Sequence, residues 1–476
     1  MTDFSQPGII NALDYGLVGN DLSAAAANTA ALQNAINAAQ ATCAESGLYG
    51  GIVIIPSNNV VPNSSDGNGG VYYFAESNPA VPAVKITCQY PLLILGTGNG
   101  TKLVMTTNND LFEVNNNPGG IAVEGGVSFQ DLQITYSTGL TSGAAIRVTG
   151  NSQNVRLFRM VFTDCPVGIA FDQSLQCSVI DSVVWFATNS GNAVTLGTIT
   201  SGNIAKETYI AGCIFEAGTT ALGTGTGLSV VNADEVRVMN TRIESFGQGI
   251  VIAPSGTGFA QHLFFENVSV YTLSQESTTV GASLLIQPTS EGSVIQAVFV
   301  GCTLSPTETT TSYRGPGVLI DQSQTTGVID QIRLVSCWSC IWQGDGLQIN
   351  GAVTNVEILG GYYSCNGQYS SGTYSGILIT SAESSSPQGV RIVGAACNNS
   401  VYTEYGGQMP ETQGYGVSIG AGPTKIRIHS CDLTENVTKN LSATTPDTTV
   451  HATDCAGYSV PQKHRREAQY ELTRCA

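Results

Sequence analysis

The sequence predicts an all-β protein, a single-stranded right-handed parallel β-helix of about a dozen coils with three short strands in each coil. One pattern repeats from about residue 125 to about residue 435: an apolar strand, a small residue, a Gly-rich loop and a second apolar strand. The segments Val236–Ile252 and Ile332–Ile349 follow this pattern closely, and no helical pattern separates their strands. Short strands repeated at such intervals are typical of a β-solenoid.

Stacking the repeats places equivalent residues in columns. The small or apolar residue that marks each coil recurs every 23–36 residues, at Leu132, Met160, Val183, Cys213, Thr241, Val268, Cys302, Cys337, Gly361, Ala395 and Cys431. Because side chains alternate between the two faces of a strand, the residue two positions later faces the interior. This inner column reads Ile134, Phe162, Trp185, Phe215, Ile243, Val270, Leu304 and Leu433. The cysteines among the markers are therefore expected to be core thiols and not metal ligands, since no Cys/His cluster has ligand spacing.

The other strands of each coil follow the same alternation. Apolar pairs two residues apart mark the second strands, as in Ile169/Phe171, Leu228/Val230, Ile250/Ile252, Leu347/Ile349 and Val417/Ile419. On a third strand, four residues before each marker, Glu357 falls between Arg333 and Arg391. We expect a ladder of ion pairs on the sheet surface there, with binding of an acidic sugar as the alternative.

The N-terminal segment has a different pattern, which predicts a capping helix. Asp14-Tyr15-Gly16 is followed by an Ala-rich stretch with Leu32 and Ile36 four residues apart, and the spacing predicts an amphipathic helix within residues 24–44. A glycine pair and an apolar strand, Gly50–Pro56, come next.

These N-terminal motifs resemble the opening of the pectate-lyase-like superfamily, in which a DYG motif, a short amphipathic helix and a GG-strand-Pro segment form the cap and first coil. The resemblance implies a parallel β-helix, a polysaccharide ligand and often a homotrimer, as in viral and phage tailspike depolymerases, polysaccharide lyases, glycosidases and epimerases. This chain has Ala27-Asn28 where the family has an acidic pair. The resemblance does not select the reaction.

The composition of the chain excludes some classes of binding partner. A net charge of −17 argues against nucleic acid or an anionic membrane as the main partner. We expect no cofactor and no metal. No secretory signal is visible at the N-terminus, so we expect synthesis in the cytoplasm and action outside the cell, on a virion or a surface.

One outward column carries the best candidate for chemistry. Immediately after the inner position, Glu216 and Glu244 occupy equivalent positions 28 residues, or one coil, apart. Adjacent strands lie ~4.8 Å apart, so the two carboxylates should be neighbours. A general acid beside a carboxylate base or nucleophile cleaves glycosidic bonds. The alternative is that both are solvated surface residues that align by chance.

The neighbours of the glutamates suggest how a substrate binds. Phe186 and Tyr271 are expected in the same column, one coil to either side, as stacking platforms for sugar rings. Arg242 is expected to hold one glutamate ionised or to bind an acidic sugar, and Asp164 and Asp172 to line the same groove. The motifs of polygalacturonases, alginate epimerases and pectate lyases are absent. The carboxylate pair and the family resemblance make a glycoside hydrolase the first hypothesis. A lyase, epimerase, transferase or non-catalytic glycan-binding fibre is the alternative.

The predicted domain organisation has three parts: a cap over residues 1–60, the β-helix over 61–440, and a linker with a basic tail over 441–476. Trp338 and Tyr362 form a second outward aromatic patch on neighbouring coils, without a carboxylate pair beside it.

Overall fold

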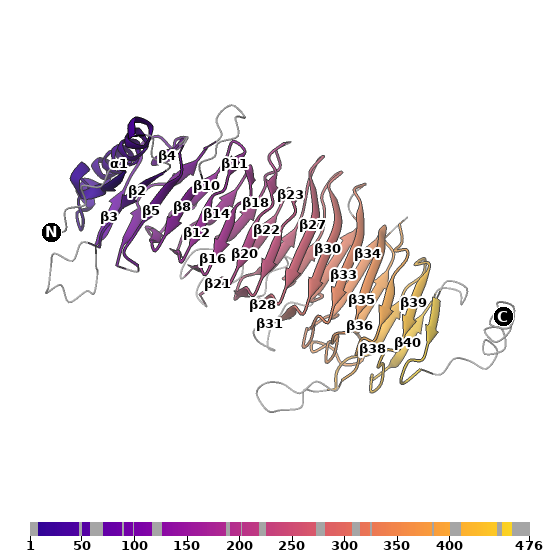
Figure 1. The fold of residues 1–476 in the computed structure, drawn as a ribbon. Helices are drawn as coiled ribbons and strands as arrows, with labels where there is room; N and C mark the ends of the chain where they lie inside the picture. The colour runs from indigo at the N-terminus through magenta and orange to yellow at the C-terminus, as the bar shows by residue number, and fades with distance from the viewer. Residues whose placement is uncertain are drawn as a thin grey trace. The chain divides into compact units, whose positions relative to one another are not determined.

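The computed structural model describes residues 8–46, 50–57, 70–87, 90–98, 100–116, 126–186, 191–200, 202–218, 225–272, 281–306, 315–323, 326–382, 385–399, 411–444 and 450–458. The chain forms two compact units, Met1–Leu273 and Ser274–Ala476. Within each unit the strands of successive coils stack into three parallel sheets, here called A, B and C (Figure 1). The expected boundaries near residues 60 and 440 stay predictions.

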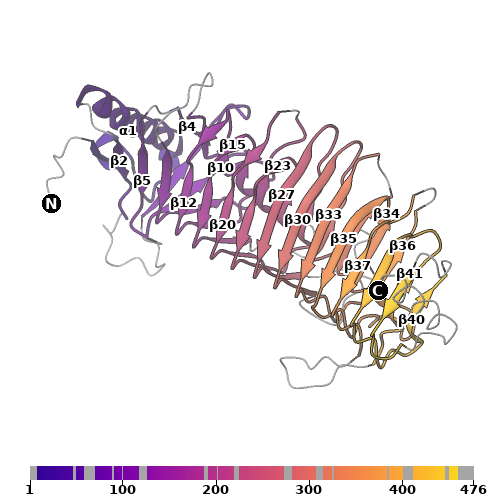
Figure 2. The same cartoon turned by 45° about the vertical axis from the view of Figure 1, so that its right-hand side comes forward.

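The first unit begins with the expected helical cap. Two short 3₁₀ turns, Ala12–Tyr15 and Leu22–Ala24, lead into α1 (Ala25–Ser46), which packs against the first strands at the N-terminal end of the unit (Figure 2). Asn28 is buried in α1, and its side-chain amide donates to the carbonyls of Val18 and Tyr73 while its oxygen accepts from the Val18 N–H. The neutral amide therefore attaches the helix to the first coil at the position where the family has acidic residues.

Sheets A, B and C of the first unit are built from parallel strands joined in order along the chain. Sheet A contains β1 (Ile9–Asn11), β2 (Gly51–Ile54), β5 (Leu92–Leu95), β8 (Val127–Gln130), β11 (Ser152–Gln153), β12 (Arg156–Phe158), β15 (Ser174–Leu175), β16 (Ser178–Ile180), β19 (Ala205–Lys206), β20 (Tyr209–Ala211), β23 (Ala233–Asp234), β24 (Arg237–Met239) and β27 (Phe259–Glu266). Sheet B contains β3 (Val71–Phe74), β6 (Lys102–Met105), β9 (Gln133–Tyr136), β13 (Val161–Thr163), β17 (Val183–Phe186), β21 (Ile214–Ala217), β25 (Arg242–Glu244) and β28 (Ser269–Thr272). Sheet C contains β4 (Val84–Ile86), β7 (Phe112–Val114), β10 (Ala144–Val148), β14 (Val167–Phe171), β18 (Asn192–Leu196), β22 (Thr226–Val230) and β26 (Gln248–Ile252).

The second unit repeats the plan with a reduced sheet B. Its sheet A contains β30 (Ser293–Val300), β33 (Ile329–Val335), β35 (Val353–Leu359), β37 (Arg391–Val393), β39 (Ile426–His429) and β41 (Val450–Thr453). Its sheet C contains β29 (Leu284–Ile286), β32 (Val318–Gln322), β34 (Leu347–Gly351), β36 (Ser375–Thr380), β38 (Tyr415–Ile419) and β40 (Lys439–Ala443). Sheet B is continued from β31 (Thr303–Pro306) by single bridges through Trp338, Tyr362, Ala396, Asp432 and Ala456.

From β8 onward, a residue with positive φ makes the corner between sheets A and B in the described coils. In the first unit the corner residues are Asp131, Arg159, Asp181, Gly212, Asn240 and Asn267, and in the second they are Gly301, Ser336, Gly360, Gly394, Ser430 and Asp454. Gly, Asn and Asp tolerate this left-handed conformation best, and they supply most of the positions. The pairing of sheet B begins two residues after each of these corners, so the corners set the register of the strands that follow them.

The positions of the corner residues show that one coil marker was assigned wrongly from the sequence. Asp181 is a corner residue, so the coil marker is the buried Ser182 and not Val183. A shift of one residue moves every side chain of a strand to the other face. Val184, and not Trp185, therefore lies in the inner column, paired with Phe162 and Phe215. The apolar pairs of sheet C lie in the core as predicted.

The expectation of core thiols is confirmed for the cysteines in the described residues. Cys213, Cys302, Cys337 and Cys431 are all buried thiols, one per coil. Burial raises the pKa of Cys213 to about 11 and that of Cys177 to about 12, so these thiols stay neutral and pack as small apolar groups.

A polar network fills the corner between sheets B and C in the second unit. The buried Gln413 accepts a hydrogen bond from the side chain of Asn366 at 3.2 Å and donates to Asn436 Oδ1 at 2.9 Å. Asn399 accepts from the Gln413 N–H, and Asn366 Oδ1 accepts from the N–H of Trp342. The amides satisfy backbone groups that the single-bridge ladder of sheet B leaves unpaired, because buried polar groups need partners.

Asp345 lies in the same region, and its pKa shows the effect of burial on a carboxyl group. It is 7% exposed, and its Oδ1 accepts from the N–H of Ser375 at 2.6 Å. Burial raises the pKa of Asp345 to about 6, from an ordinary value of 3.8. The folded state thus favours the neutral carboxyl, and the stability that this group contributes is greatest below about pH 4 and is lost as the pH rises through about 6.

We expect Asp345→Asn to gain stability relative to the wild type as the pH rises from about 4 to about 7, by up to about 3 kcal/mol. Urea unfolding curves at several pH values measure the difference. Asp330→Asn is the control with the opposite sign: burial raises the pKa of Asp330, but hydrogen bonds from Thr354, Asn355 and Gln331 outweigh it and lower the pKa. If the free energies of unfolding of wild type and Asp345→Asn changed with pH in the same way, a raised pKa for Asp345 would be contradicted.

Candidate functional site

The two predicted glutamates lie side by side on the outer face of sheet B in the first unit. Glu216 on β21 pairs with Glu244 on β25 in the parallel register. The Cα atoms are therefore one strand spacing apart, ~4.8 Å, and both side chains leave the same face of the sheet. Phe215 and Ile243, the residues before them, are buried in the core and fix the orientation of both strands.

One glutamate has a cationic partner. Arg242, two residues before Glu244 on the same face, forms an ion pair through its Nη2 with Glu244 Oε2. A guanidinium bonded to a carboxylate favours the ionised form of that carboxylate. The structure thus places Arg242 beside Glu244, and its role in keeping a glutamate ionised or in binding an acidic sugar stays a prediction. In the part of the chain that the structure describes, Glu216 has no ion pair, so the two carboxylates have different environments.

Aromatic side chains flank the pair, although one differs from the prediction. Tyr271 on β28 pairs with Glu244, as expected. On the other side, Glu216 pairs with Trp185, whose side chain is 42% exposed. The outer column of sheet B, in register from β17 to β28, is therefore Trp185, Glu216, Glu244 and Tyr271.

The prediction that Phe186 is an outward platform is wrong. Phe186 is fully buried, and its ring packs edge to face against Phe246 with centroids 5.9 Å apart. The error follows from the one-residue shift at Ser182, which exchanges the faces of Trp185 and Phe186. The corner residue Asp181, in the same place as Asp131 and Asn240 of other coils, is the sequence signal that identifies Trp185.

The two aspartates lie in different places. Asp164 follows β13 at the edge of sheet B, two strands from Glu216, and its N–H donates to the carbonyl of Trp185 at 3.0 Å. It has positive φ, so its backbone makes a corner between strands. It is the nearer of the two to the glutamates in the sheet order.

Asp172 does not line the same face, contrary to expectation. It follows β14 in sheet C, where it forms an ion pair with Arg147 at 2.5 Å. Arg147 also binds Asp110 at 2.6 Å. Burial raises the pKa of Asp172, and Arg147 opposes the rise. This three-residue cluster is a structural ion network of sheet C.

Three further features belong to the described residues. No group of three or more His, Cys, Asp or Glu side chains within them could hold a metal ion. Within the described helices, none combines the length and the apolar character needed to cross a membrane. The expected surface ladder is present in the second unit, where Glu357 pairs with Arg333 at 2.7 Å and with Arg391 at 3.4 Å.

Solved structures similar to this chain are parallel β-helix proteins. A tailspike of Escherichia coli bacteriophage HK620, solved with a pentasaccharide, aligns with a TM-score of 0.57 and 11% identity over 94% of this chain and 79% of the tailspike. Tailspike protein 3 of bacteriophage CBA120 aligns with a TM-score of 0.55 and 13% identity over 95% of this chain and 62% of that one. The A-module of the Azotobacter vinelandii mannuronan C-5 epimerase AlgE6 aligns with a TM-score of 0.52 and 13% identity, over 95% of this chain and all of the module.

Sequence comparison finds no such relatives: no protein-family model and no curated protein matches the chain. At 11–14% identity the structural likeness shows the fold, and it does not show the reaction. The chain therefore has a right-handed parallel β-helix fold, capped by an N-terminal helix.

The corrected register makes a stability prediction. Phe186→Ala should lower the free energy of unfolding by about 3–5 kcal/mol, because it removes a buried ring from the core. Trp185→Ala should cost less, about 1–2 kcal/mol, because 42% of the Trp185 surface is already in water. Urea unfolding followed by circular dichroism compares the two, and an equal loss would contradict the assigned faces.

Proposed function

We propose that this protein is a glycoside hydrolase that cleaves a polysaccharide, with Glu216 and Glu244 as its two catalytic carboxyl groups. The observation that carries the proposal is their pairing in register on adjacent strands, with aromatic residues on the flanking strands. Glycosidases use two carboxyl groups on opposite sides of the scissile bond. Two of the solved structures similar in fold, both variants of the HK620 tailspike, were solved with a pentasaccharide.

The unequal environments of the glutamates suggest their roles. Glu244, bonded to Arg242, acts as the ionised carboxylate that attacks the anomeric carbon or activates a water molecule. Glu216 acts as the general acid that protonates the departing glycosidic oxygen. A separation of about 5–5.5 Å between the carboxyl groups suits retention, and about 6.5–9.5 Å suits inversion. The side-chain separation in the substrate complex decides between them.

The flanking rings position the sugar chain. Trp185 and Tyr271 lie three strand spacings apart along the coil axis, about 14 Å, with both glutamates between them. Aromatic faces stack against the apolar faces of sugar rings. The polysaccharide therefore runs across the strands of sheet B, parallel to the coil axis. We further propose that the protein acts outside the cell as part of a virion, as a homotrimer.

Arg242 favours a second reaction class. An arginine that binds a sugar carboxylate would serve a lyase or epimerase, and one structural neighbour is named a mannuronan epimerase. The Glu244 ion pair occupies this guanidinium, so hydrolysis of the glycosidic bond is the better supported reaction.

A glycan-binding fibre without catalysis is favoured by a different observation. Trp338 and Tyr362, on neighbouring coils of the second unit, are 45% and 44% exposed. Their ring centroids are 4.8 Å apart in an edge-to-face arrangement. Such an exposed aromatic pair suits sugar binding. Measuring the release of reducing ends distinguishes a fibre that only binds the glycan from an enzyme that cleaves it.

We expect Glu216→Gln and Glu244→Gln each to lower kcat by about 10²–10⁴-fold on bacterial or algal polysaccharides, because each removes proton transfer or nucleophile activation. Stability should stay within about 0.5 kcal/mol of wild type, since both are surface positions. The double variant should lose little more than either single one. Release of reducing ends measures the rate.

Glu266→Gln, the same charge change on sheet A of this unit, is the control and should retain full turnover. Reducing ends accompanied by the ultraviolet absorbance of unsaturated uronates would indicate a lyase. Binding with neither signal would indicate a fibre. Near-native turnover in both glutamine variants would place the catalytic site elsewhere, with Asp164 the next candidate.

The aromatic platforms should affect binding more than chemistry. Trp185→Ala and Tyr271→Ala should each raise KM or weaken binding by up to about 10-fold, since stacking on an aromatic ring is worth about 0.5–1.5 kcal/mol. Fluorescence titration and initial rates on the same polysaccharide measure both effects. Trp338→Ala is the matched control on the second unit, and a larger effect of this variant would favour the second aromatic patch.

A further inference from the structure

A column rich in arginine lies on the outer face of sheet A in the second unit. Five strands, β33 to β41, place Arg333, Glu357, Arg391, Arg427 and His451 in consecutive register. Glu357 is the one acidic member. The protein as a whole carries a net charge of −17, so this column is a local reversal of its charge.

Glu357, the single carboxylate, neutralises only the Arg333 end of this column. Glu357 accepts from Arg333 Nε at 2.7 Å and from Arg391 Nη1 at 3.4 Å, so it is already shared between two arginines. Within the described residues Arg427 has no ion pair. Arg391 and Arg427 lie one strand spacing apart, ~4.8 Å at the backbone, and like charges at this separation repel.

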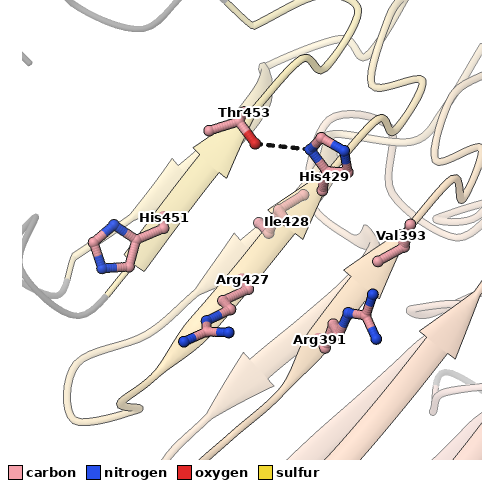
Figure 3. A pocket seen from close by; sticks show the side chains of 7 residues that line it. All are labelled: Arg391, Val393, Arg427, Ile428, His429, His451 and Thr453. Carbon is pink, nitrogen blue, oxygen red and sulfur yellow. Dashed lines mark hydrogen bonds between the residues drawn. The ribbon is translucent and has the colours of Figure 1, made fainter. Parts of the chain in front are cut away.

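A pocket opens beside this unneutralised end. It has a volume of about 250 Å³, and its polar wall consists of Arg391, Arg427, His429, His451 and Thr453 (Figure 3). Figure 3 shows Arg391 and Arg427 next to each other on adjacent strands, with His451 on the strand beyond them. His429 Nδ1 is 2.8 Å from Thr453 Oγ1, at the other end of the pocket.

The acidic groups near the pocket lie at its margin. Asp454 Oδ2 is 3.7 Å from His429 Nδ1, and its side chain is 76% exposed. Glu357 lies on the far side of Arg391 from Arg427, because β35, β37 and β39 follow one another in the sheet. The space between Arg391, Arg427 and His451 therefore has nitrogen donors and no carboxylate in the wall.

We propose that this pocket binds an oxyanion, namely a carboxylate, sulfate or phosphate group, carried by an acidic saccharide or present as a free inorganic anion. Guanidinium groups bind such oxyanions with two parallel hydrogen bonds each, a geometry that lysine does not provide. An anion between Arg391 and Arg427 neutralises the repulsion between them. The site is separate from Glu216 and Glu244, and it does not depend on the reaction proposed for them.

Isothermal titration of the full-length protein tests the proposal. The probes are sodium sulfate, sodium phosphate and sodium galacturonate, each at constant low ionic strength because salt screens exposed charges. Wild type should bind at least one probe. Arg427→Gln should weaken that binding at least 10-fold, and Arg427→Lys should weaken it less, since it keeps the charge and loses the planar fork.

Arg237→Gln is the matched control. Arg237 occupies the same outward position of sheet A in the first unit, but its register neighbours are Tyr209 and Phe264 instead of other cations. This variant should titrate as wild type does. Circular dichroism confirms that each variant is folded; Arg427 is an exposed side chain, so its replacement should not unfold the protein.

The outcomes separate the sources of the anion. Galacturonate binding tighter than inorganic sulfate or phosphate supports an acidic saccharide. Binding of sulfate or phosphate alone supports a free anion or its ester. Failure of wild type to bind any of the three probes would overturn the proposal, and so would equal affinities for Arg427→Gln and Arg237→Gln. Loss of hydrolysis in the glutamate variants leaves this result unchanged, so the two proposals fail independently.

Discussion

The parallel backbone ladder between successive coils is the constraint on which the other features depend. It fixes which residue of one coil faces which residue of the next, whatever the length of the loops between them. Residues distant in sequence therefore become neighbours ~4.8 Å apart in a column. A charged or aromatic side chain that occurs in only one coil stands alone on the surface. When the same kind of side chain occurs at the same position of consecutive coils, the side chains form an extended surface. Both candidate sites of this protein are such columns.

The corner residues keep this ladder in register. A single left-handed residue between sheets A and B turns the chain sharply without a loop, and the strand that follows begins two residues later. This is why Asp181 determines the faces of Trp185 and Phe186. The cost of a non-glycine residue in this conformation is modest for Asp and Asn, and the ladder hydrogen bonds on both sides offset it.

The two columns use the same geometry with opposite charge. On sheet B of the first unit two carboxylates are adjacent, and one of them is bonded to Arg242. On sheet A of the second unit two guanidiniums are adjacent, and one of them shares Glu357. In each pair one member is partly neutralised and the other is not. The first arrangement supplies the two carboxyl groups that the proposed hydrolysis needs, and the second suits the proposed anion binding, because adjacent like charges attract a counter-ion.

The sequence alone determined the β-helix, the capping helix, the inward cysteines and the pairing of Glu216 with Glu244. These depend on local alternation and on a spacing of one coil, both of which are visible in one dimension. The tertiary structure decided what depends on exact register and on partners from other coils. It placed Trp185 outward and Phe186 inward, and it assigned Asp172 to an ion network of sheet C. Loops of variable length hide such relations in the sequence, because a shift of one residue costs nothing in the pattern but exchanges the two faces of a strand.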